Sequence, residues 1–315
     1  MPLDDEALGA WGATLPGLAV GARLGSGAFG AVLAAEHPVH GPVALKVLRP
    51  GATIDPEAFR SVAAIEHPNL LRLFGHGEHA GRAFLIMERI DGRDLLSAVR
   101  PPRPPIDPSK VRATIPLAFG QPVQEGGGSV FAPIHREGLD RLVPALRQLA
   151  AALVALHGAA KVHRDVRPEN VLVTRDGRVV LVDYGLLIDV GEEIAADLPL
   201  RGAARPDIAG APAYMAPDDE PSPAADWYAF GVLLFEALTG ALPFAGNAHE
   251  VVIRKRTVLA PSPSFVVDLP DDRRARALDE LCIKLLRRAV RLRAGAEEVA
   301  RVFEEISRST DAPQV

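Results

Sequence analysis

A glycine-rich run and a lysine among apolar residues give the first fifty residues the chemistry of a phosphate-binding site. Gly25, Gly27 and Gly30 have the spacing G-x-G-x-x-G, and residues without a Cβ let backbone N–H groups approach a phosphate closely. In a dinucleotide-binding turn the glycines open a helix, whereas here they lead into a run typical of a strand. Lys46 then lies in the apolar run 43–48, where an ammonium is costly unless it meets an anion. The alternative for Lys46 is an edge position that reaches solvent.

Two aspartates and an asparagine in the second half of the chain could take part in phosphoryl transfer. Asp165 and Asn170 belong to the run His163–Asn170, and Asp183 follows the apolar run 179–182. Transfer of a phosphoryl group requires a group that accepts the proton of the attacking hydroxyl, and oxygen ligands for Mg²⁺. These three side chains supply those groups, so we expect them to meet in one site that uses ATP and Mg²⁺.

The elements that must position these residues change in character along the chain. Between residues 18 and 90 the pattern is mostly short β-rich runs broken by Gly and Pro, which predicts a strand-dominated first part; the runs are Leu24–Ala35, Val43–Leu48, Leu70–Gly75 and Ala83–Met87. A short helix is predicted between the second and third strands, with Asp55 as its N-cap, Pro56 as its first residue and an end near Ile65.

After Gly92 the pattern becomes helical. Leucines at helical spacing predict a helix over Pro144–His157 that Gly158 ends. The apolar run Trp227–Phe244 is interrupted by Glu236, which favours a buried helix over a membrane span. We expect Arg100–Gly138, rich in Pro and Gly, to be a surface insertion, either a passive loop or one that docks a partner or covers the cleft. From Ser307 the chain has no periodicity, which predicts a frayed tail.

Composition narrows the classes of function. The chain has 315 residues, a net charge of −5 and a pI near 6.0, which argues against a surface built mainly for nucleic acid or anionic lipid. Its single cysteine, Cys282, excludes an internal disulfide and favours a buried thiol on a helix. The acidic N-terminus lacks the order of a signal peptide, which indicates a cytoplasmic location without a membrane span.

In this order the motifs resemble those of the eukaryotic-type (Hanks-type) serine/threonine protein kinases of bacteria. The likeness covers residues 24–293 and includes 24–32, Lys46, 163–170, 183–185 and 210–218. It implies an α+β, bilobal protein-kinase-like fold with a small antiparallel β-sheet N-lobe and a larger α-helical C-lobe. The domain would span 19–308, with lobes at 19–90 and 91–308, an N-terminal extension at 1–18 and a tail at 309–315. The partners implied are protein substrates, and a regulatory protein or further domains of a longer chain remain open.

The resemblance assigns roles to single residues. It makes Asp165 the catalytic base, Lys46 a ligand of the α- and β-phosphates, and Asn170 and Asp183 the magnesium ligands. Arg167 stands where serine/threonine kinases have a lysine directed at the γ-phosphate. Nucleotide contacts would come from the glycine-rich run, the hinge and the apolar walls around the adenine: Leu24, Gly25, Ser26, Gly27, Gly30, Val32, Ala44, Met87, Glu88, Ile90 and Leu172.

Three further acids have roles by the same resemblance. Asp94 would contact the ribose, or alternatively cap a helix before Leu95. Asp226 would brace the loop that carries Asp165. Asp218 would pair with Arg293 and tie the activation segment to the C-terminal helices.

The sequence departs from the family pattern around Lys46. Ala58 stands where the glutamate partner of the lysine is expected, and Glu57 is one residue away. Glu57 would either pair with Lys46 or act as a first-turn acid that the helix dipole favours. Ala211 replaces a threonine that usually orients the catalytic loop.

The activation segment is also unusual, because residues 185–213 contain no Ser, Thr or Tyr. We therefore expect activity that is constitutive or driven by a partner. Arg164 would then pair with a carboxylate of this segment (Asp189, Glu192, Glu193, Asp197 or Asp207) or stay unpaired. The sequence favours a protein kinase over a nucleotide-binding pseudokinase or scaffold, and both over a small-molecule kinase.

Overall fold

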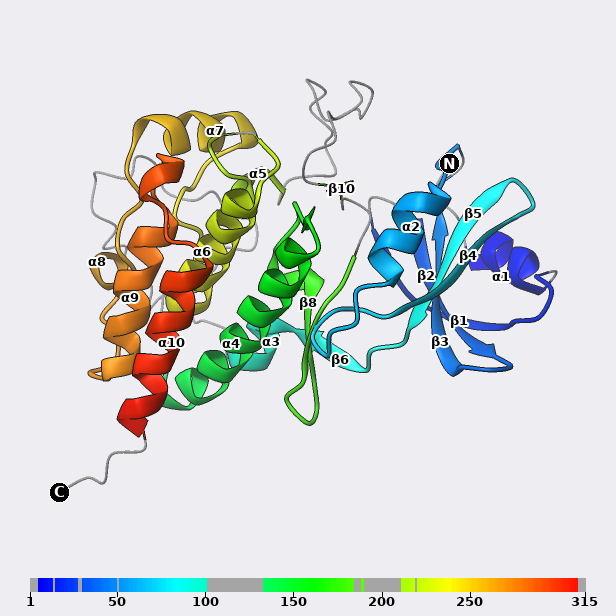
Figure 1. Cartoon of the computed structure of the whole chain (residues 1–315), viewed down its shortest axis with the longest axis horizontal. Helices are drawn as coiled ribbons and strands as arrows, with labels where there is room; N and C mark the ends of the chain where they lie inside the picture. Colours follow the sequence, from blue (N-terminus) through cyan, green and yellow to red (C-terminus); the bar gives the residue numbers. More distant parts are fainter. Residues whose placement is uncertain are drawn as a thin grey trace, which may run out of the picture.

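The computed structural model describes residues 5–13, 15–27, 30–49, 51–100, 133–183, 188–189, 211–218 and 220–310. The chain forms a small, strand-rich lobe and a larger helical lobe (Figure 1), which confirms the expected bilobal α+β architecture. The expectations for most of the insertion, for Tyr184 and Gly185, and for the acids at 192, 193, 197 and 207 lie outside the described residues.

The small lobe is built on one antiparallel five-stranded sheet in the order β1-β2-β3-β5-β4. Its strands are β1 (Ala19–Gly27), β2 (Gly30–His37), β3 (Gly41–Leu48), β4 (Leu73–His79) and β5 (Arg82–Glu88). The β-rich run Leu24–Ala35 contains the end of β1 and most of β2, which pair antiparallel as far as Gly27 and Gly30.

The prediction of a strand at Leu70–Gly75 was wrong in its start. Leu70 and Leu71 pair with Leu181 of the large lobe, and the backbone N–H of Leu71 donates to the Leu181 carbonyl at 3.1 Å. Because their backbone hydrogen-bonding groups are used in that contact, the sheet strand begins only at Leu73 and continues to His79.

Two helices accompany the sheet. The helix α2 (Pro56–Ala63) begins as predicted, and the Asp55 side chain accepts a hydrogen bond from the Glu57 N–H at 2.8 Å. The helix α1 (Asp5–Ala13) was not predicted and lies at the end of the small lobe remote from the large lobe (Figure 1). Its Leu8 and Trp11 are buried in one cluster with residues of the sheet, including Leu45 and Phe84.

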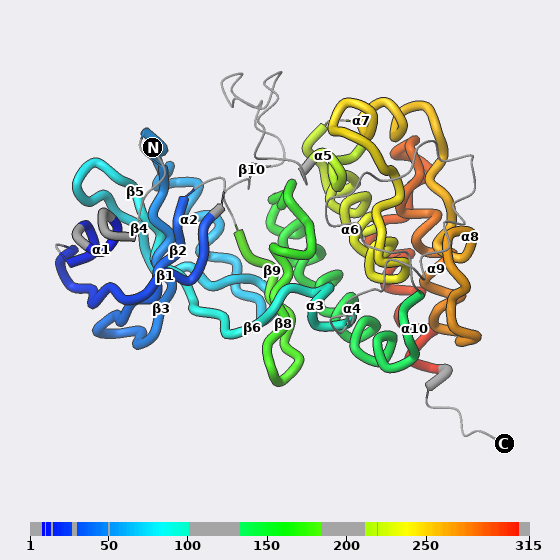
Figure 2. Tube along the Cα trace, turned by 180° about the vertical axis from the view of Figure 1, so that it is seen from behind, coloured from blue at the N-terminus to red at the C-terminus, as the bar shows by residue number. Residues whose placement is uncertain are grey.

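The large lobe contains the remaining elements, and Figure 2 shows β6 and β8 between the two lobes. The strands are β6 (Gly92–Asp94), β7 (Lys161–Val162), β8 (Val171–Thr174), β9 (Val179–Leu181) and β10 (Ile188–Asp189). The helices are α3 (Leu95–Val99), α4 (Arg136–Gly158), η3 (Pro168–Asn170), α5 (Ala211–Tyr214), α6 (Pro223–Thr239), α7 (Ala248–Thr257), α8 (Pro263–Val266), α9 (Arg273–Leu285), η5 (Val290–Leu292) and α10 (Ala296–Thr310).

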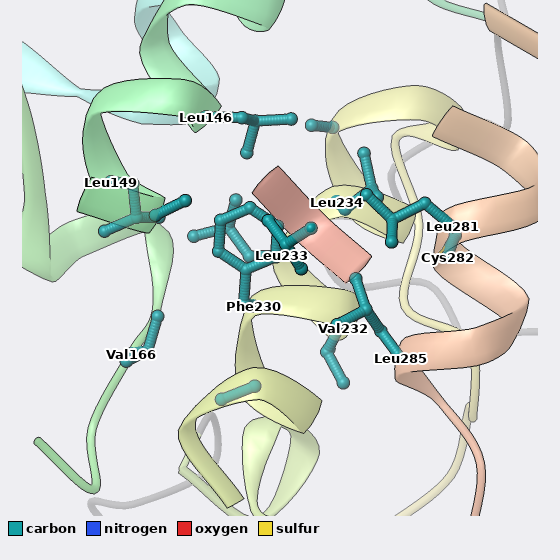
Figure 3. Packing of buried hydrophobic residues seen from close by; sticks show 14 of the residues in the cluster. Leu146, Leu149, Val166, Phe230, Val232, Leu233, Leu234, Leu281, Cys282 and Leu285 are labelled. Atoms are coloured by element: carbon teal, nitrogen blue, oxygen red, sulfur yellow. The ribbon is translucent and has the colours of Figure 1, made fainter. Parts of the chain in front are cut away.

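The core of the large lobe surrounds α6, which is the buried helix that the sequence predicted. Phe230 and Leu233 of α6 pack between Leu146 of α4 and Leu281 of α9 (Figure 3). Cys282 is buried as expected, and burial raises the pKa of its thiol. Among the described helices, none is both long and apolar enough to cross a membrane.

The helix α4 begins eight residues before its predicted start, and Pro144 lies inside it. A proline inside a helix costs about 3 kcal/mol, whereas each fully buried leucine contributes about 1.5–3 kcal/mol. Leu139 and Leu142, which precede the proline, are both fully buried, so their burial outweighs the lost hydrogen bond.

The structure also corrects the predicted end of the insertion, the end of α4 and the start of the C-terminal tail. The insertion does not extend to Gly138, because Ile134 is buried and its N–H donates to the Leu238 carbonyl at 2.9 Å. Gly158 is the last residue of α4 rather than its stop, and Ala160 adopts the left-handed conformation, with φ of 56°. At the C-terminus the chain is helical as far as Thr310, so Ser307 does not begin a frayed tail.

Candidate active site

The glycines of the glycine-rich run lie on the end of β1 and the start of β2. Gly25 pairs with Val32, Ser26 with Ala31 and Gly27 with Gly30. A Cβ on Gly25 would have no atom within 4 Å, whereas a Cβ on Gly30 would lie 2.0 Å from the Val47 carbonyl oxygen. Gly30 is therefore required by the fold, and the space at Gly25 faces away from other protein atoms.

Lys46 comes from the centre of the small sheet and reaches the large lobe. It lies on β3 between Val32 of β2 and Leu85 of β5 and is only 8% exposed. Its ammonium donates to the carboxylate of Asp183, which follows β9. Asp183 has a φ of 72°, a conformation that costs an L-residue about 1–2 kcal/mol. Two predicted site residues from opposite lobes thus form one ion pair.

Asp165 and Asn170 are held together by the loop that connects β7 to β8. The Asn170 side-chain N–H donates to the Asp165 carboxylate at 2.8 Å and to the Asp165 carbonyl at 2.9 Å. The Val182 N–H in turn donates to the Asn170 carbonyl at 2.8 Å. This hydrogen bond connects the loop to the residue before Asp183, so the three oxygen-bearing side chains belong to one structural unit.

Asp226 braces this loop, as the sequence predicted. Its carboxylate is 1% exposed and accepts backbone N–H bonds from His163 and Arg164, each at 2.7 Å. His157 of α4 contacts the same carboxylate at 2.9 Å. These bonds hold Arg164 at a φ of 69°, and backbone strain of this kind persists only where the surroundings fix it.

The charges around Asp165 oppose the effect of its burial. Burial raises the pKa of the Asp165 carboxyl, while the electrostatic effects of Arg167 and His163 act to lower it. Arg167 donates to the Glu169 carboxylate at 2.8 Å. A carboxylate with a raised pKa is a better proton acceptor near neutral pH than an ordinary aspartate.

Four of the predicted adenine contacts belong to one apolar cluster. Ala44 and Met87 are buried in one apolar cluster, and Val32 and Ile90 pack against it. Leu172 lies on β8, where it pairs with both Asp94 and Val180. Leu24, by contrast, is 52% exposed on β1.

The hinge contains an ion pair, between Glu88 and Arg178, that was not predicted from the sequence. Glu88 ends β5, and its carboxylate accepts two hydrogen bonds from the Arg178 guanidinium, at 2.6 and 3.2 Å. Arg178 also donates to the Pro68 carbonyl at 2.8 Å. Nothing in the residues around Arg178 indicates a partner ninety residues away.

Asp94 and Glu57 each lie at the start of a helix, which bears on the two roles considered for each of them. Asp94 caps α3, and its side chain accepts a hydrogen bond from the Ser97 N–H at 2.9 Å; its contact with ribose stays a prediction. Glu57 is exposed in the first turn of α2, and within the described part of the chain no ion pair joins it to Lys46. The dipole interpretation of Glu57 is therefore the better one.

Arg164 is half-buried, and most of the acids expected as its partner lie outside the described residues. Burial lowers the pKa of its guanidinium, and its Nη1 is buried without a hydrogen-bond partner among the described residues. Of the five acids considered for it, only Asp189 is described, and there only by its backbone pairing with Lys161.

The comparisons with known proteins agree with this geometry. A family model described as protein tyrosine and serine/threonine kinase matches residues 18–260. The chain belongs to the protein kinase family. It is 30% identical over 256 residues to the serine/threonine-protein kinase pkn2 of Myxococcus xanthus, a match that covers 76% of this chain and 26% of the relative.

Two mycobacterial kinases give similar matches. The serine/threonine-protein kinase PknA of Mycobacterium tuberculosis is 30% identical over 279 residues, which cover 82% of this chain and 55% of PknA. PknL of the same species is 31% identical over 241 residues, with 72% of this chain and 50% of PknL covered. The chain therefore spans about a quarter to a half of the length of these curated relatives.

The end of the activation segment of this kinase is held by contacts from α6, from α7 and from Arg293, which follows η5. Arg293 pairs with Asp218 as predicted. Two contacts were not predicted: Tyr214 donates to the half-buried carboxylate of Glu236 on α6, and Lys255 of α7 donates to the carbonyls of Pro212, Ala213 and Met215. Burial raises the pKa of both Tyr214 and Glu236. A lysine in a basic run, Arg254–Arg256, gave no signal of this role.

Proposed function

We propose that this chain transfers the γ-phosphate of ATP to serine or threonine hydroxyls of protein substrates in a reaction that depends on Mg²⁺. The observation that carries the proposal is that Lys46 contacts Asp183 and Asp165 contacts Asn170, with a backbone hydrogen bond from Val182 to Asn170 that links the two pairs. These are the groups that phosphoryl transfer requires for phosphate, metal and proton.

Asp165 takes the proton in this proposal. The substrate hydroxyl gives its proton to the Asp165 carboxylate while its oxygen attacks the γ-phosphorus, and the bond between that phosphorus and ADP breaks. Arg167, close enough to interact electrostatically with Asp165, places a positive charge beside the γ-phosphate. The backbone N–H groups of residues 25–27 contact the phosphates, and Lys46 binds the α- and β-phosphates.

The metal ligands are the Asp183 carboxylate and the Asn170 amide oxygen. The amide nitrogen of Asn170 donates to Asp165, so the amide oxygen is the end left for a cation. Carboxylate and amide oxygens suit Mg²⁺. When bound, Mg²⁺ would neutralise negative charge on the β- and γ-phosphates.

The nucleotide base and sugar complete the proposal. Val32, Ala44, Met87, Ile90 and Leu172 enclose the adenine, Glu88 contributes its backbone, and Asp94 reaches the ribose. Because ATP is the phosphate donor, we also propose that the kinase acts in the cytoplasm.

The test is transfer of labelled phosphate from Mg-ATP to the chain itself and to a generic basic protein, compared with Asp165→Asn. We expect kcat to fall by about 10²–10⁴-fold in the variant, while Mg-ATP binding by calorimetry is kept. Binding without transfer in the unmodified chain would instead identify a nucleotide-binding scaffold. Equal transfer by both proteins would exclude Asp165 as the base.

A further inference from the structure

A pocket of about 470 Å³ lies on the large lobe beside the end of the activation segment. Pro217 and Asp218 form one wall, and Arg256 with Leu259, at and after the end of α7, forms the second. The third wall contains Arg287 and Arg288, which follow α9, and Leu292 of η5. None of the roles proposed above uses this pocket.

The pocket is strongly positive although the chain is acidic overall. Three arginines line it, and Asp218, an acid in its wall, is bound to Arg293, whose side chain is fully buried. Arg287 and Arg288 are exposed, and in the described part of the chain neither forms an ion pair. Arg288 donates from Nη1 to the Arg256 carbonyl at 2.5 Å, which holds its guanidinium at the pocket. Positive charges that line one pocket repel each other, so an anion bound there would be favoured.

The rim of the same pocket is apolar. Leu259 is 59% exposed and Leu292 is 61% exposed, and two exposed leucines that flank one pocket provide area for a large apolar side chain. A small inorganic anion would leave this area uncovered. A peptide that carries acidic residues around one apolar residue would satisfy both surfaces.

One wall of the pocket also contacts the end of the activation segment, at residues 215–217. The Arg256 side chain donates to the Pro217 carbonyl at 3.3 Å, and the neighbouring Lys255 donates to the Met215 carbonyl at 2.8 Å. A peptide bound at Arg256 and Leu259 would therefore lie next to the segment that leads to the active site. This position fits a part of the substrate at some distance from the phosphorylated residue.

We propose that this pocket docks an acidic segment of the protein substrate, with carboxylates at Arg287 and Arg288 and one large apolar side chain between Leu259 and Leu292. The inference rests on the proposed kinase function, because it identifies the occupant as a substrate. It predicts that good substrates carry an acidic and apolar stretch outside their phosphorylation site.

The first experiment measures binding without nucleotide or catalysis. A fluorescein-labelled peptide of repeated Glu-Glu-Leu units is titrated with the full chain, with Arg287→Glu and with Leu292→Ser, by fluorescence anisotropy. We expect Kd to weaken by about tenfold for Arg287→Glu, where attraction becomes repulsion, and by about fivefold for Leu292→Ser.

Arg308→Glu is the matched control. Arg308 is exposed in the last turn of α10, and its reversal changes the net charge equally. Figure 1 shows the C-terminal end of α10 at the opposite end of the large lobe from α7. The proposal is overturned if Arg287→Glu binds the acidic peptide as the unmodified chain does, if Arg308→Glu loses as much affinity, or if a Lys-Lys-Leu peptide binds equally well.

The second experiment measures kinetics with dephosphorylated casein, an acidic protein. Arg287→Glu should raise the KM for casein by about tenfold with kcat and the KM for ATP unchanged, because the docking pocket is separate from the cleft. An unchanged KM for casein would overturn the proposal. If the unmodified chain transfers no phosphate, the proposed function fails, and the peptide titration alone still decides whether the pocket binds acidic segments.

Discussion

Gly25 and Gly30 occupy equivalent ends of one motif and yet have different physical reasons to be glycine. Gly30 has a φ of 151° and no room for a Cβ beside the Val47 carbonyl. Gly25 has an ordinary backbone conformation and open space where a Cβ would stand. The sequence motif alone does not separate a glycine that the sheet needs from one that a ligand needs.

The first prediction uses this difference. Gly30→Ala should lower the free energy of unfolding by about 1–3 kcal/mol, because the sheet must shift to admit the methyl group. Gly25→Ala should leave stability nearly unchanged and weaken ATP binding, because its methyl group would lie in the phosphate approach. Urea unfolding and ATP titration of both variants provide the measurements, and equal destabilisation by the two would contradict the assignment.

The second prediction concerns Glu57. Since its carboxylate is exposed and Lys46 pairs with Asp183, Glu57→Gln should change kcat by less than about twofold, as is usual for exposed sites. Lys46→Met, in contrast, should abolish measurable transfer. A loss of about tenfold or more in Glu57→Gln would show that the α2 glutamate supports the lysine during turnover.

At the scale of elements, the short helix α5 depends on its neighbours. Four residues are too few for a stable helix in isolation, and its C-terminal carbonyls need donors. Lys255, 2% exposed on α7, supplies them and lies 5.6 Å from the centre of the Tyr228 ring. The position of α7 therefore decides the position of the activation segment's end.

The third prediction is that Lys255→Met destabilises the fold by about 1–3 kcal/mol, because buried carbonyls lose their donor. It should also raise the KM for protein substrate while the KM for ATP stays unchanged. Lys255→Arg keeps the charge and should recover part of both effects. If Lys255→Met lowers stability but leaves the KM for protein unchanged, the lysine has a structural role only.

Elements whose ends depend on local chemistry were predictable. The start of α2 follows from Asp55 and Pro56, which act within one turn of the helix. The start of α4 was not, because Pro144 is a local signal against a helix and is outweighed by burial against α6 and α9. Leu70 was misassigned for the same reason, since its partner, Leu181, lies more than a hundred residues along the chain.

At the scale of the whole molecule, the chain before β1 forms part of the small lobe. Trp11 of α1 is 8% exposed, its indole N–H donates to the His79 carbonyl at 2.9 Å, and its ring packs edge-on against Phe84. Gly12 lies so close to Val20 that a Cβ would approach it to 2.7 Å.

The fourth prediction follows from this packing. Trp11→Ala should lower the free energy of unfolding by about 3–5 kcal/mol, as for other buried aromatic residues. Trp11→Phe, which keeps a ring but lacks the donor to His79, should lose less than half of that. Chemical denaturation followed by circular dichroism measures both, and a cost below about 1 kcal/mol for Trp11→Ala would show that α1 is dispensable to the lobe.

The components of the candidate site were predictable from the sequence, because each motif is contiguous and the motifs occur in a fixed order. Their mutual geometry was not. Lys46 meets Asp183 across 137 residues, and Glu88 meets Arg178 across 90. Such pairs depend on how the two lobes pack, which no local pattern encodes.

The ion pair between Lys46 and Asp183 has a thermodynamic consequence. Each partner is also the proposed ligand of a different part of Mg-ATP, so phosphate that binds Lys46 releases Asp183, and a cation that binds Asp183 releases Lys46. The free energy needed to separate the ion pair is therefore spent when the first ligand binds, and the second ligand binds without it. Metal and nucleotide should therefore bind with positive coupling, and each should tighten the other by the same factor.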